Sequence, residues 1–461
     1  MIIIYLSIFI VICIVLCIYA FSKTKFIITN EQYIKNEQYI TIDREKKPFF
    51  LIHISKTGGT FIENYLKKSH VNVGRFDNML KRMSNNMTIE CSKYHIPPKY
   101  FPSIDFKKLH TFTVIRHPLE RIISEYNYRK TFFGKNVHLG INDFVKQNVY
   151  KNNTMFDCHL IPQHEYIKDL HGNSCEMFLR FEHLTHDLKW YCRQHNIPIH
   201  NKKVKKLKSK PIANQNQMTE ETKQFVLNFY QKDLELWKRA STNVIYIYWD
   251  SGFINAPEII QICLQSWKIM NPTWVLIELN RDNLRDYITE TDMQFLQKQE
   301  SKMTKTSFSD LIRLCLLKEH GGLWVDATLF CMKPLNEWIH DSSSNGFFAF
   351  YNPLQQISSF FLYAHIESHV IGKWFKKMKK YWIERKEMEE YFWMHRLFRK
   401  CYQDDEEFRE NIDKMTKINT IPIHEYQKHG ILNANTPVQK LNYKKKIKVS
   451  ILQNFLSKKK N

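Results

Sequence analysis

The stretch from Phe49 to Leu66, FFLIHISKTGGTFIENYL, constrains the fold of this chain more than any other. An apolar run rich in β-branched and aromatic residues meets a Gly-rich turn and then an amphipathic segment, which predicts a strand, a loop and a helix. Backbone N–H groups at the start of such a helix can converge on an anion. Lys56 precedes the glycines, whereas the nucleotide-hydrolase pattern GxxxxGK(S/T) places its lysine after them. The stretch therefore predicts an α/β fold with an anion-binding loop of another kind.

Two strand-first segments predict two domains. From Phe49 to about Ala240, strand-like runs alternate with helical ones, as in an α/β domain. A second strand signal, NVIYIYWDSG, begins at Asn243 and opens another α/β region. We therefore place the first domain at residues 49–240 and the second at residues 241–461. A chain of 461 residues with 43% hydrophobic side chains is long enough to bury two cores.

The amino-terminal segment, residues 2–21, carries no charged side chain and has the length of a helix that spans a bilayer. No small-residue cleavage site stands out, so we expect an uncleaved anchor followed by a stalk at residues 22–48. Lysines directly after the span favour the cytoplasmic side, whereas glycosylation sequons at Asn86 and Asn152 suit a lumenal domain. These signals alone leave the orientation open.

The formal charge of +22 implies anionic partners such as nucleotides, acidic polysaccharide, nucleic acid or a membrane surface. A codon bias toward Lys, Asn and Ile is the plainer explanation of the charge. No nucleic-acid-binding motif accompanies it, so we expect no nucleic-acid partner.

Cysteine spacing gives no metal signal. Of the ten cysteines, two lie in the predicted anchor and the other eight are scattered, without a CxxC pair or a Cys/His cluster. Some pairs can form disulfides if the domains are lumenal, but the sequence does not assign them.

A second phosphate signal lies downstream, in the segment FTVIRHPLERIISEYNY. Arg116 ends a predicted strand and Ser124 lies two turns into the predicted helix, so both side chains can face one ligand. A guanidinium and a hydroxyl together suit a phosphate group. With SKTGGT, this segment resembles the Golgi-type carbohydrate sulfotransferases, which take sulfate from 3′-phosphoadenosine 5′-phosphosulfate (PAPS).

The resemblance spans roughly Phe49 to Arg239 and implies a P-loop-like domain, a parallel sheet flanked by helices. In that family the first loop holds the 5′-phosphosulfate and the RxPxxRxxSxY segment holds the 3′-phosphate. Carried over, Arg116 and Ser124 would bind the 3′-phosphate of the donor. The residues that would cradle the phosphosulfate are Ser55, Lys56, Thr57, Gly58, Gly59 and Thr60.

Sulfuryl transfer also needs catalytic groups. Lys56 would neutralise the charge that grows on the bridging oxygen as the S–O bond breaks. For the general base we expect His95, which lies between the two motifs beside a Pro-Pro turn. His110, His53 and Glu63 are the alternatives.

Plainer interpretations remain for these segments. The glycines alone suit an ordinary strand-to-helix turn, but such a turn does not account for the Arg/Ser motif. A kinase or NTPase is disfavoured because the lysine is misplaced and no Walker B aspartate stands out. The segment Asp157 to Asp169 suggests a metal site, a loop that contacts the acceptor, or surface polarity. The lysines of residues 202–210 suggest either steering of an anion or a solvated linker.

The second half has its own constellation in SFSDLIRLCLLKEHGGLWVDATLF, residues 307–330. The pattern predicts a helix carrying Asp310 and Arg313, a C-cap at the two glycines, and a strand over LWVDATLF. Asp326 falls where a buried strand ends, a costly place for a carboxylate without a cation or ligand. Supporting segments are YIYWDSG at 246–252, YFWMHRLF at 391–398 and PVQKLNYK at 437–444.

These segments resemble glycosyltransferases of the capsular-polysaccharide-synthesis type, related to the sugar-binding DXD group. The resemblance implies a Rossmann-like nucleotide-diphospho-sugar transferase domain. Asp326 would act in catalysis by binding Mn²⁺ or Mg²⁺ on the sugar nucleotide. Asp310 and Arg313 would hold the donor, and Trp249 would line the nucleotide pocket. Thr328 stands where the DXD pattern has its second carboxylate, which leaves metal dependence open.

The sequence thus predicts a membrane-anchored bifunctional enzyme that transfers sulfate from PAPS and a sugar from a nucleotide-sugar to a glycan acceptor. We expect a type II membrane protein with its domains in the Golgi or secretory lumen, because stalked glycan transferases usually face that side. One alternative is an active sulfotransferase half joined to a lapsed glycosyltransferase module. Another is a non-enzymatic, membrane-tethered glycan-binding protein.

Overall fold

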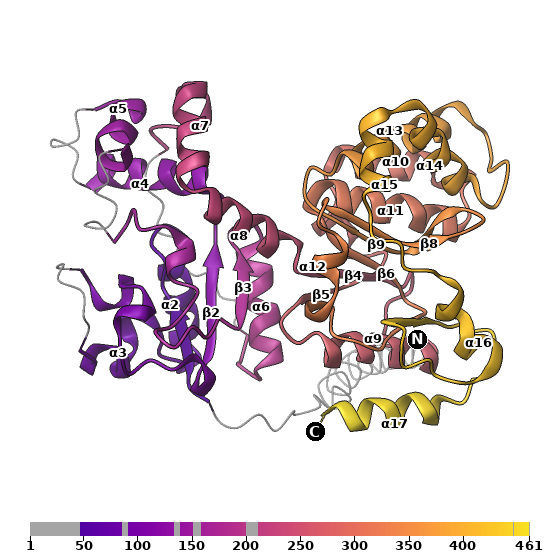
Figure 1. Cartoon of the computed structure of the whole chain (residues 1–461), viewed down its shortest axis with the longest axis horizontal. Coiled ribbons are helices and arrows are strands. Elements are labelled where there is room, and N and C mark those ends of the chain that lie inside the picture. The colour runs from indigo at the N-terminus through magenta and orange to yellow at the C-terminus, as the bar shows by residue number, and fades with distance from the viewer. Residues whose placement is uncertain are drawn as a thin grey trace, which may run out of the picture. The chain divides into compact units, whose positions relative to one another are not determined.

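The computed structural model describes residues 47–84, 91–132, 139–150, 158–199, 211–445 and 447–460. From Pro48 onward the chain forms one compact unit of mixed α/β structure (Figure 1). The predicted anchor, most of the stalk, both sequons and the lysines of residues 202–210 lie outside the described residues. None of the helices within the described ranges is long and apolar enough to cross a bilayer.

The first sheet is parallel and has the strand order β1-β2-β3. Its strands are β1 (Phe49–Ile52), β2 (His110–Ile115) and β3 (Met177–Arg180). The strand predicted at Phe49 is therefore confirmed. Because all three strands run in one direction, their carboxyl ends share one edge of the sheet, where α/β folds bind ligands.

Helices surround this sheet, with α2 and α6 beside it in Figure 1. They are α2 (Gly59–Lys67), α3 (Asn78–Arg82), α4 (Pro118–Phe132), α5 (Ile141–Val145), α6 (Leu184–Gln194), α7 (Glu220–Phe229) and α8 (Gln231–Thr242). Helices α7 and α8 follow each other directly and are separated at Tyr230. The buried Tyr230 hydroxyl donates a hydrogen bond to the Leu160 carbonyl at 2.8 Å.

The second sheet has the strand order β5-β4-β6-β9-β8. Its strands are β4 (Val244–Tyr248), β5 (Val275–Leu279), β6 (Gly322–Asp326), β8 (Phe347–Asn352) and β9 (Gln356–Ala364). Strands β5, β4 and β6 are parallel, whereas β9 and β8 join antiparallel. The strand predicted from Asn243 is confirmed as β4, which pairs with β5 and β6.

The prediction of one strand over LWVDATLF was wrong. The chain turns at Ala327 and Thr328, so β6 ends at Asp326 and a separate strand, β7 (Leu329–Cys331), follows. Strand β7 pairs antiparallel with β10 (Val438–Lys440) in a two-stranded sheet. The sequence shows one continuous apolar run here. The break depends on pairing with β10, which lies more than a hundred residues away and so leaves no local signal.

The predicted helix end at Gly321 is confirmed. Helix α11 (Lys305–His320) ends there at φ +64°, and the Gly321 N–H donates to the Leu317 carbonyl at 3.0 Å. A Cβ on Gly322, the first residue of β6, would lie 2.4 Å from Val244 Cγ1, so only glycine lets β6 pair this closely with β4.

The other helices of this half cover the second sheet, and α17 packs along α9 (Figure 1). They are α9 (Glu258–Met270), α10 (Glu290–Gln299), α12 (Ile339–Ser342), α13 (His369–Glu384), α14 (Trp393–Asp404), α15 (Glu406–Asp413), α16 (Glu425–His429) and α17 (Val449–Lys460). One apolar core cluster includes Leu51 and Phe112 of the first sheet and Val244 and Trp324 of the second. Burial of this apolar surface is the main stabilising term for the unit.

Candidate functional site

The loop between β1 and α2 is shaped by its two glycines. Gly58 caps α2 at φ +92°, in the left-handed region that favours glycine. A Cβ on Gly59 would lie 2.2 Å from the His53 ring, and a Cβ on Gly58 would lie 2.7 Å from Leu184. Lys56 also has a positive φ, +63°. A side chain at position 58 or 59 would collide with these neighbours, so the loop needs glycine at both positions.

Two hydroxyls of the predicted cradle stabilise the loop itself. Ser55 Oγ donates to the His159 carbonyl at 3.1 Å, and Thr57 Oγ1 donates to the Ile54 carbonyl at 2.8 Å. Both side chains are buried. Thr60 lies half-buried in the first turn of α2. The loop thus offers an anion its backbone N–H groups and the Lys56 ammonium rather than the Ser55 and Thr57 hydroxyls.

Arg116, directly after β2, joins the two phosphate motifs. Its Nη1 donates to the Lys56 carbonyl at 3.0 Å, and its guanidinium lies 3.9 Å from the centre of the Phe181 ring. The Gln163 side chain holds the Arg116 backbone through hydrogen bonds of 3.0 and 2.8 Å to N–H and C=O. Two segments 60 residues apart are therefore in contact at the carboxyl edge of the parallel sheet.

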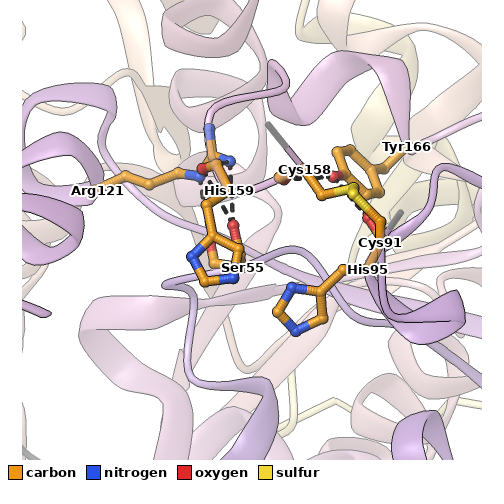
Figure 2. The surroundings of a disulfide bond; sticks show 7 residues. All are labelled: Ser55, Cys91, His95, Arg121, Cys158, His159 and Tyr166. Carbon is orange, nitrogen blue, oxygen red and sulfur yellow. Dashed lines mark hydrogen bonds between the residues drawn. A yellow bond between two sulfur atoms is a disulfide. The ribbon is translucent and has the colours of Figure 1, made fainter. Parts of the chain in front are cut away.

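Arg121 in α4 binds the backbone of the loop between β1 and α2. Figure 2 shows Arg121 beside Ser55 and His159. Arg121 Nε donates to the Ser55 carbonyl at 3.2 Å, and its Nη2 donates to the carbonyls of His159 and Ile161 at 2.8 and 2.9 Å. The side chain is only 1% exposed, so this cation is used for positioning. Ser124, on the same helix, is half-buried, and the structure shows it in no hydrogen bond within the described residues.

His95 lies at the end of a short 3₁₀ turn, Lys93–His95, among other imidazoles. Its ring centre is 4.7 Å from that of His53 and 5.0 Å from that of His159. Burial is the largest cause that lowers the pKa of His95, and with the neighbouring histidines and the charges of Lys56 and Arg121 it brings that pKa to about 2. The imidazole is therefore neutral and carries a lone pair near the loop.

A disulfide joins the two segments that carry these imidazoles. Cys91, four residues before His95, is bonded to Cys158, which directly precedes His159 (Figure 2). The Tyr166 hydroxyl adds a second connection, because it lies 2.9 Å from the carbonyls of both His95 and Cys158. The sequence left the cysteine pairing open and did not single out His159, although its segment, Asp157 to Asp169, was noted with a metal site, an acceptor loop and surface polarity as alternatives.

Lys56 faces this cluster. Its Nζ lies 3.9 Å from the centre of the Tyr128 ring. Burial lowers the pKa of Lys56 to about 8, the charge of Glu125 opposes this shift, and the charge of Arg116 adds to it. Glu125 Oε2 accepts a hydrogen bond from His159 Nδ1 at 2.9 Å. Glu125, which the sequence did not single out, thus connects the lysine to the imidazoles.

The alternative bases are placed differently. Both carboxylate oxygens of the buried Glu63 are engaged, by His53 Nδ1 at 2.7 Å and by Arg75 Nε at 3.0 Å. His110 opens β2 beside Glu176, whereas Arg116 follows the last residue of that strand. At roughly 3.3 Å per residue, His110 lies about 20 Å from the loop edge.

In the second half, the structure brings Asp310, Arg313 and Asp326 together. Arg313 Nη2 lies 2.9 Å from Asp310 Oδ1 and 3.5 Å from Asp326 Oδ1. Burial raises the pKa of Asp310 to about 6, with the charge of Arg313 opposing the shift and that of Asp326 adding to it. The guanidinium thus bridges two carboxylates, one on α11 and one at the carboxyl end of β6.

Lys440 of β10 completes this ionic group, and the sequence did not single it out. Its Nζ lies 2.6 Å from Asp326 Oδ2, while Trp324 Nε1 donates to Asp326 Oδ1 at 3.1 Å. Although burial opposes the shift, Lys440 and Arg313 lower the pKa of Asp326 to about 2. Lys440 lies in the segment PVQKLNYK, which supports the glycosyltransferase resemblance, and this membership was the one sign in the sequence that Lys440 belongs to the site.

Two aromatic groups flank the same region. Trp249, which follows β4, meets Tyr443 edge-on with ring centres 5.4 Å apart. His395 of α14 has its pKa lowered to about 4 by burial and by the charges of Arg313 and Arg399. Trp393, two residues earlier in the same helix, is fully buried.

The residues around Asp326 do not fit a site for a hard divalent cation, which takes six or more oxygen ligands and needs at least one carboxylate oxygen free to bind it. Asp326 has cations on both oxygens, and Thr328 supplies only a hydroxyl. Within the described parts of the chain, no three His, Cys, Asp or Glu side chains gather in a way that could hold a metal.

Comparison with known proteins gives two family matches. Residues 193–459 match the family described as capsular polysaccharide synthesis protein, and residues 38–238 match the sulfotransferase family. A curated relative, the glycosyltransferase afumC of Aspergillus fumigatus, is 28% identical over 116 residues, covering 23% of this chain and 30% of the relative. The solved PaToxG glycosyltransferase aligns with a TM-score of 0.29 at 13% identity, over 37% of this chain and 72% of that one.

Proposed function

Because the chain belongs to the capsular polysaccharide synthesis protein family and its N-terminal half matches the sulfotransferase family, we propose a bifunctional glycan-modifying transferase. In this proposal residues 49–240 transfer sulfate from PAPS, and residues 241–461 transfer a sugar from a nucleotide-sugar. The acceptor of both groups is a glycan hydroxyl.

The observation that carries the first activity is the 3.0 Å hydrogen bond from Arg116 to the Lys56 carbonyl. It places a guanidinium beside a Gly-rich, lysine-bearing loop at a helix start. Each of these elements suits one phosphate group. A donor with two separate phosphate groups, as PAPS has, matches two adjacent anion-binding elements better than a single phosphate does.

PAPS supplies an activated sulfuryl group when it is bound. His95, held neutral, can accept the proton of the acceptor hydroxyl, and the hydroxyl oxygen then forms the new bond to sulfur. The bond from sulfur to the 5′-phosphate oxygen breaks, and its electron pair stays on that oxygen. The Lys56 ammonium stabilises this negative charge.

The low pKa of His95 is consistent with this role once the anionic donor is considered. Burial is the largest cause of the low pKa of His95, and the positive charges of Lys56 and Arg121 add to the shift. A bound anion opposes that repulsion and so raises the pKa of His95 toward the range of an effective base.

For the second activity, we propose that Asp310 and Arg313 hold the donor sugar or its diphosphate and that Trp249 lines the nucleotide pocket. The grouping of Asp310, Arg313 and Asp326 at the carboxyl end of β6 supports this assignment. Ligands of α/β sheets bind at that edge of the parallel strands.

We also propose that residues 2–21 anchor the protein and that its catalytic part faces the secretory lumen. The disulfide between Cys91 and Cys158 supports the lumenal side, because disulfides persist in oxidising compartments and are rare in the cytosol.

Binding of 3′-phosphoadenosine 5′-phosphate (PAP) tests the first activity. We expect PAP at 100 times its Kd to stabilise the full chain by about 2.7 kcal/mol, read as a rise in melting temperature. The substitution Lys56→Ala should remove most of this rise, and Lys68→Ala, an exposed lysine after the same helix, should leave it intact. Equal stabilisation of the wild type and Lys56→Ala would contradict the proposal.

A further inference from the structure

Lys440 and Asp326 form an ion pair that solvent can reach. The Lys440 side chain is 18% exposed and that of Asp326 is 27% exposed, whereas Arg313 behind them is 4% exposed. The pair lies at the carboxyl end of β6, where the parallel strands of the sheet end. It therefore occupies a position from which side chains can contact a bound ligand.

The backbone holds Lys440 at this position. Strand β10 pairs with β7 so that Lys440 lies opposite Leu329, and the next N–H, that of Leu441, donates to the Thr328 carbonyl at 2.9 Å. The turn after Asp326 and the strand that carries Lys440 are thus joined by main-chain hydrogen bonds. The ammonium is placed by the fold, and not only by the reach of a flexible side chain.

The charges around the pair favour an anion. An ammonium has three N–H donors, and the contact with Asp326 occupies one of them. Arg313 and Arg399 lower the pKa of His395, and Lys440 and Lys428 lower that of His424, in each case after burial as the larger cause. Arg313 of α11 and Lys440 of β10, although each contacts a carboxylate, therefore also act on side chains beyond the pair.

We propose that Lys440 is the fixed cation that binds the diphosphate of the sugar nucleotide, held in place by Asp326, so that donor binding requires no divalent metal. This inference rests on the proposed sugar-nucleotide function of the second half. The DXD resemblance implies that Asp326 binds a metal ion. In this proposal Asp326 instead positions Lys440.

Nucleoside diphosphate binding tests the proposal. UDP, GDP, CDP and ADP are titrated by calorimetry into the full chain, once in EDTA and once in MnCl₂. We expect one of them to bind in EDTA with an affinity that Mn²⁺ changes less than about threefold. Lys440→Met should weaken that binding about 10- to 100-fold, the range for a lost hydrogen bond to a charged group.

Two further variants keep the test sharp. Lys440→Arg retains a cation and should bind within a few-fold of the wild type, which separates loss of charge from loss of folding. Lys445→Met removes an exposed lysine of the same basic segment and should leave binding unchanged. An unchanged melting temperature of Lys440→Met confirms that the variant is folded.

The outcomes separate this inference from the function on which it rests. Binding that appears only with Mn²⁺, or binding in EDTA that Lys440→Met leaves intact, overturns the role of Lys440 while the sugar-nucleotide function stands. Absence of binding by all four nucleotides under both conditions overturns the proposed function of the second half and the inference with it.

Discussion

Lys56 is the residue whose charge state we expect to matter most for the proposed sulfate transfer. Burial lowers its pKa to about 8, which leaves the ammonium charged at pH 7 and lets it lose its proton as the pH rises through 8. An anionic donor binds the charged form, so binding raises the pKa of the lysine and affinity depends on pH. Arg116, whose side chain contacts the Lys56 backbone, keeps its own charge throughout this range because an arginine does not deprotonate there.

We therefore predict that the affinity for PAP is constant from pH 7 to about 8 and then falls, by at most about tenfold per pH unit. Calorimetric titration of PAP between about pH 6.5 and 9.5 measures it. In Lys56→Arg, where the cation does not titrate, the affinity should stay level across the same range. A level profile in the wild type, or the same decline in the arginine variant, would show that Lys56 does not bind the donor.

At the scale of elements, the His95 cluster depends on two short irregular segments. The Lys93–His95 turn and the turn that begins at Cys158 are neither long helices nor strands, so few main-chain hydrogen bonds hold them together. The Cys91–Cys158 disulfide supplies a covalent connection across 67 residues. In the chain-entropy model, closing a loop of this length stabilises the fold by about 4 kcal/mol.

We predict that the double variant Cys91→Ser with Cys158→Ser loses at least about tenfold in PAPS turnover, because His95 and His159 are no longer held side by side. The free energy of unfolding should also fall, by about 2 to 4 kcal/mol. Turnover is measured over a panel of glycan acceptors at a temperature where the variant is folded. Sugar transfer serves as the internal control, and an equal fall of both activities would indicate general unfolding and not a local role.

At the scale of the molecule, two candidate sites share one folded unit. Each lies at the carboxyl edge of its own parallel strands, and the apolar core cluster includes residues of both sheets. Lys56 and Asp326 are only partly buried, and neither belongs to that apolar cluster. Substituting either residue should therefore change its own site while the shared core stays intact.

We predict that Lys56→Ala abolishes sulfate transfer and spares sugar transfer, while Asp326→Ala does the reverse. Both variants should melt within a few degrees of the wild type. The measurement is transfer of labelled sulfate and of labelled sugar by the full chain to the same acceptor panel. If Asp326→Ala leaves the detectable activities unchanged, the second half is a binding module. If either variant abolishes both activities, the two sites are coupled.

Local sequence determined the elements that form from neighbouring residues. The strand and helix around SKTGGT, the strand β4 and the helix end at Gly321 follow from apolar periodicity and from glycine backbone freedom, which act over a few residues. The order of the motifs and the location of Lys56, Arg116, Asp310, Arg313 and Asp326 were likewise readable in the sequence.

Only the tertiary structure decided which distant residues meet. The Arg116 contact with Lys56, the Cys91–Cys158 disulfide and the Lys440 contact with Asp326 join residues 60, 67 and 114 positions apart. The turn that separates β6 from β7, which places Lys440 at Asp326, likewise depends on pairing with β10. Such contacts follow from strand order and packing, and no local pattern encodes them, because their stability comes from the whole fold.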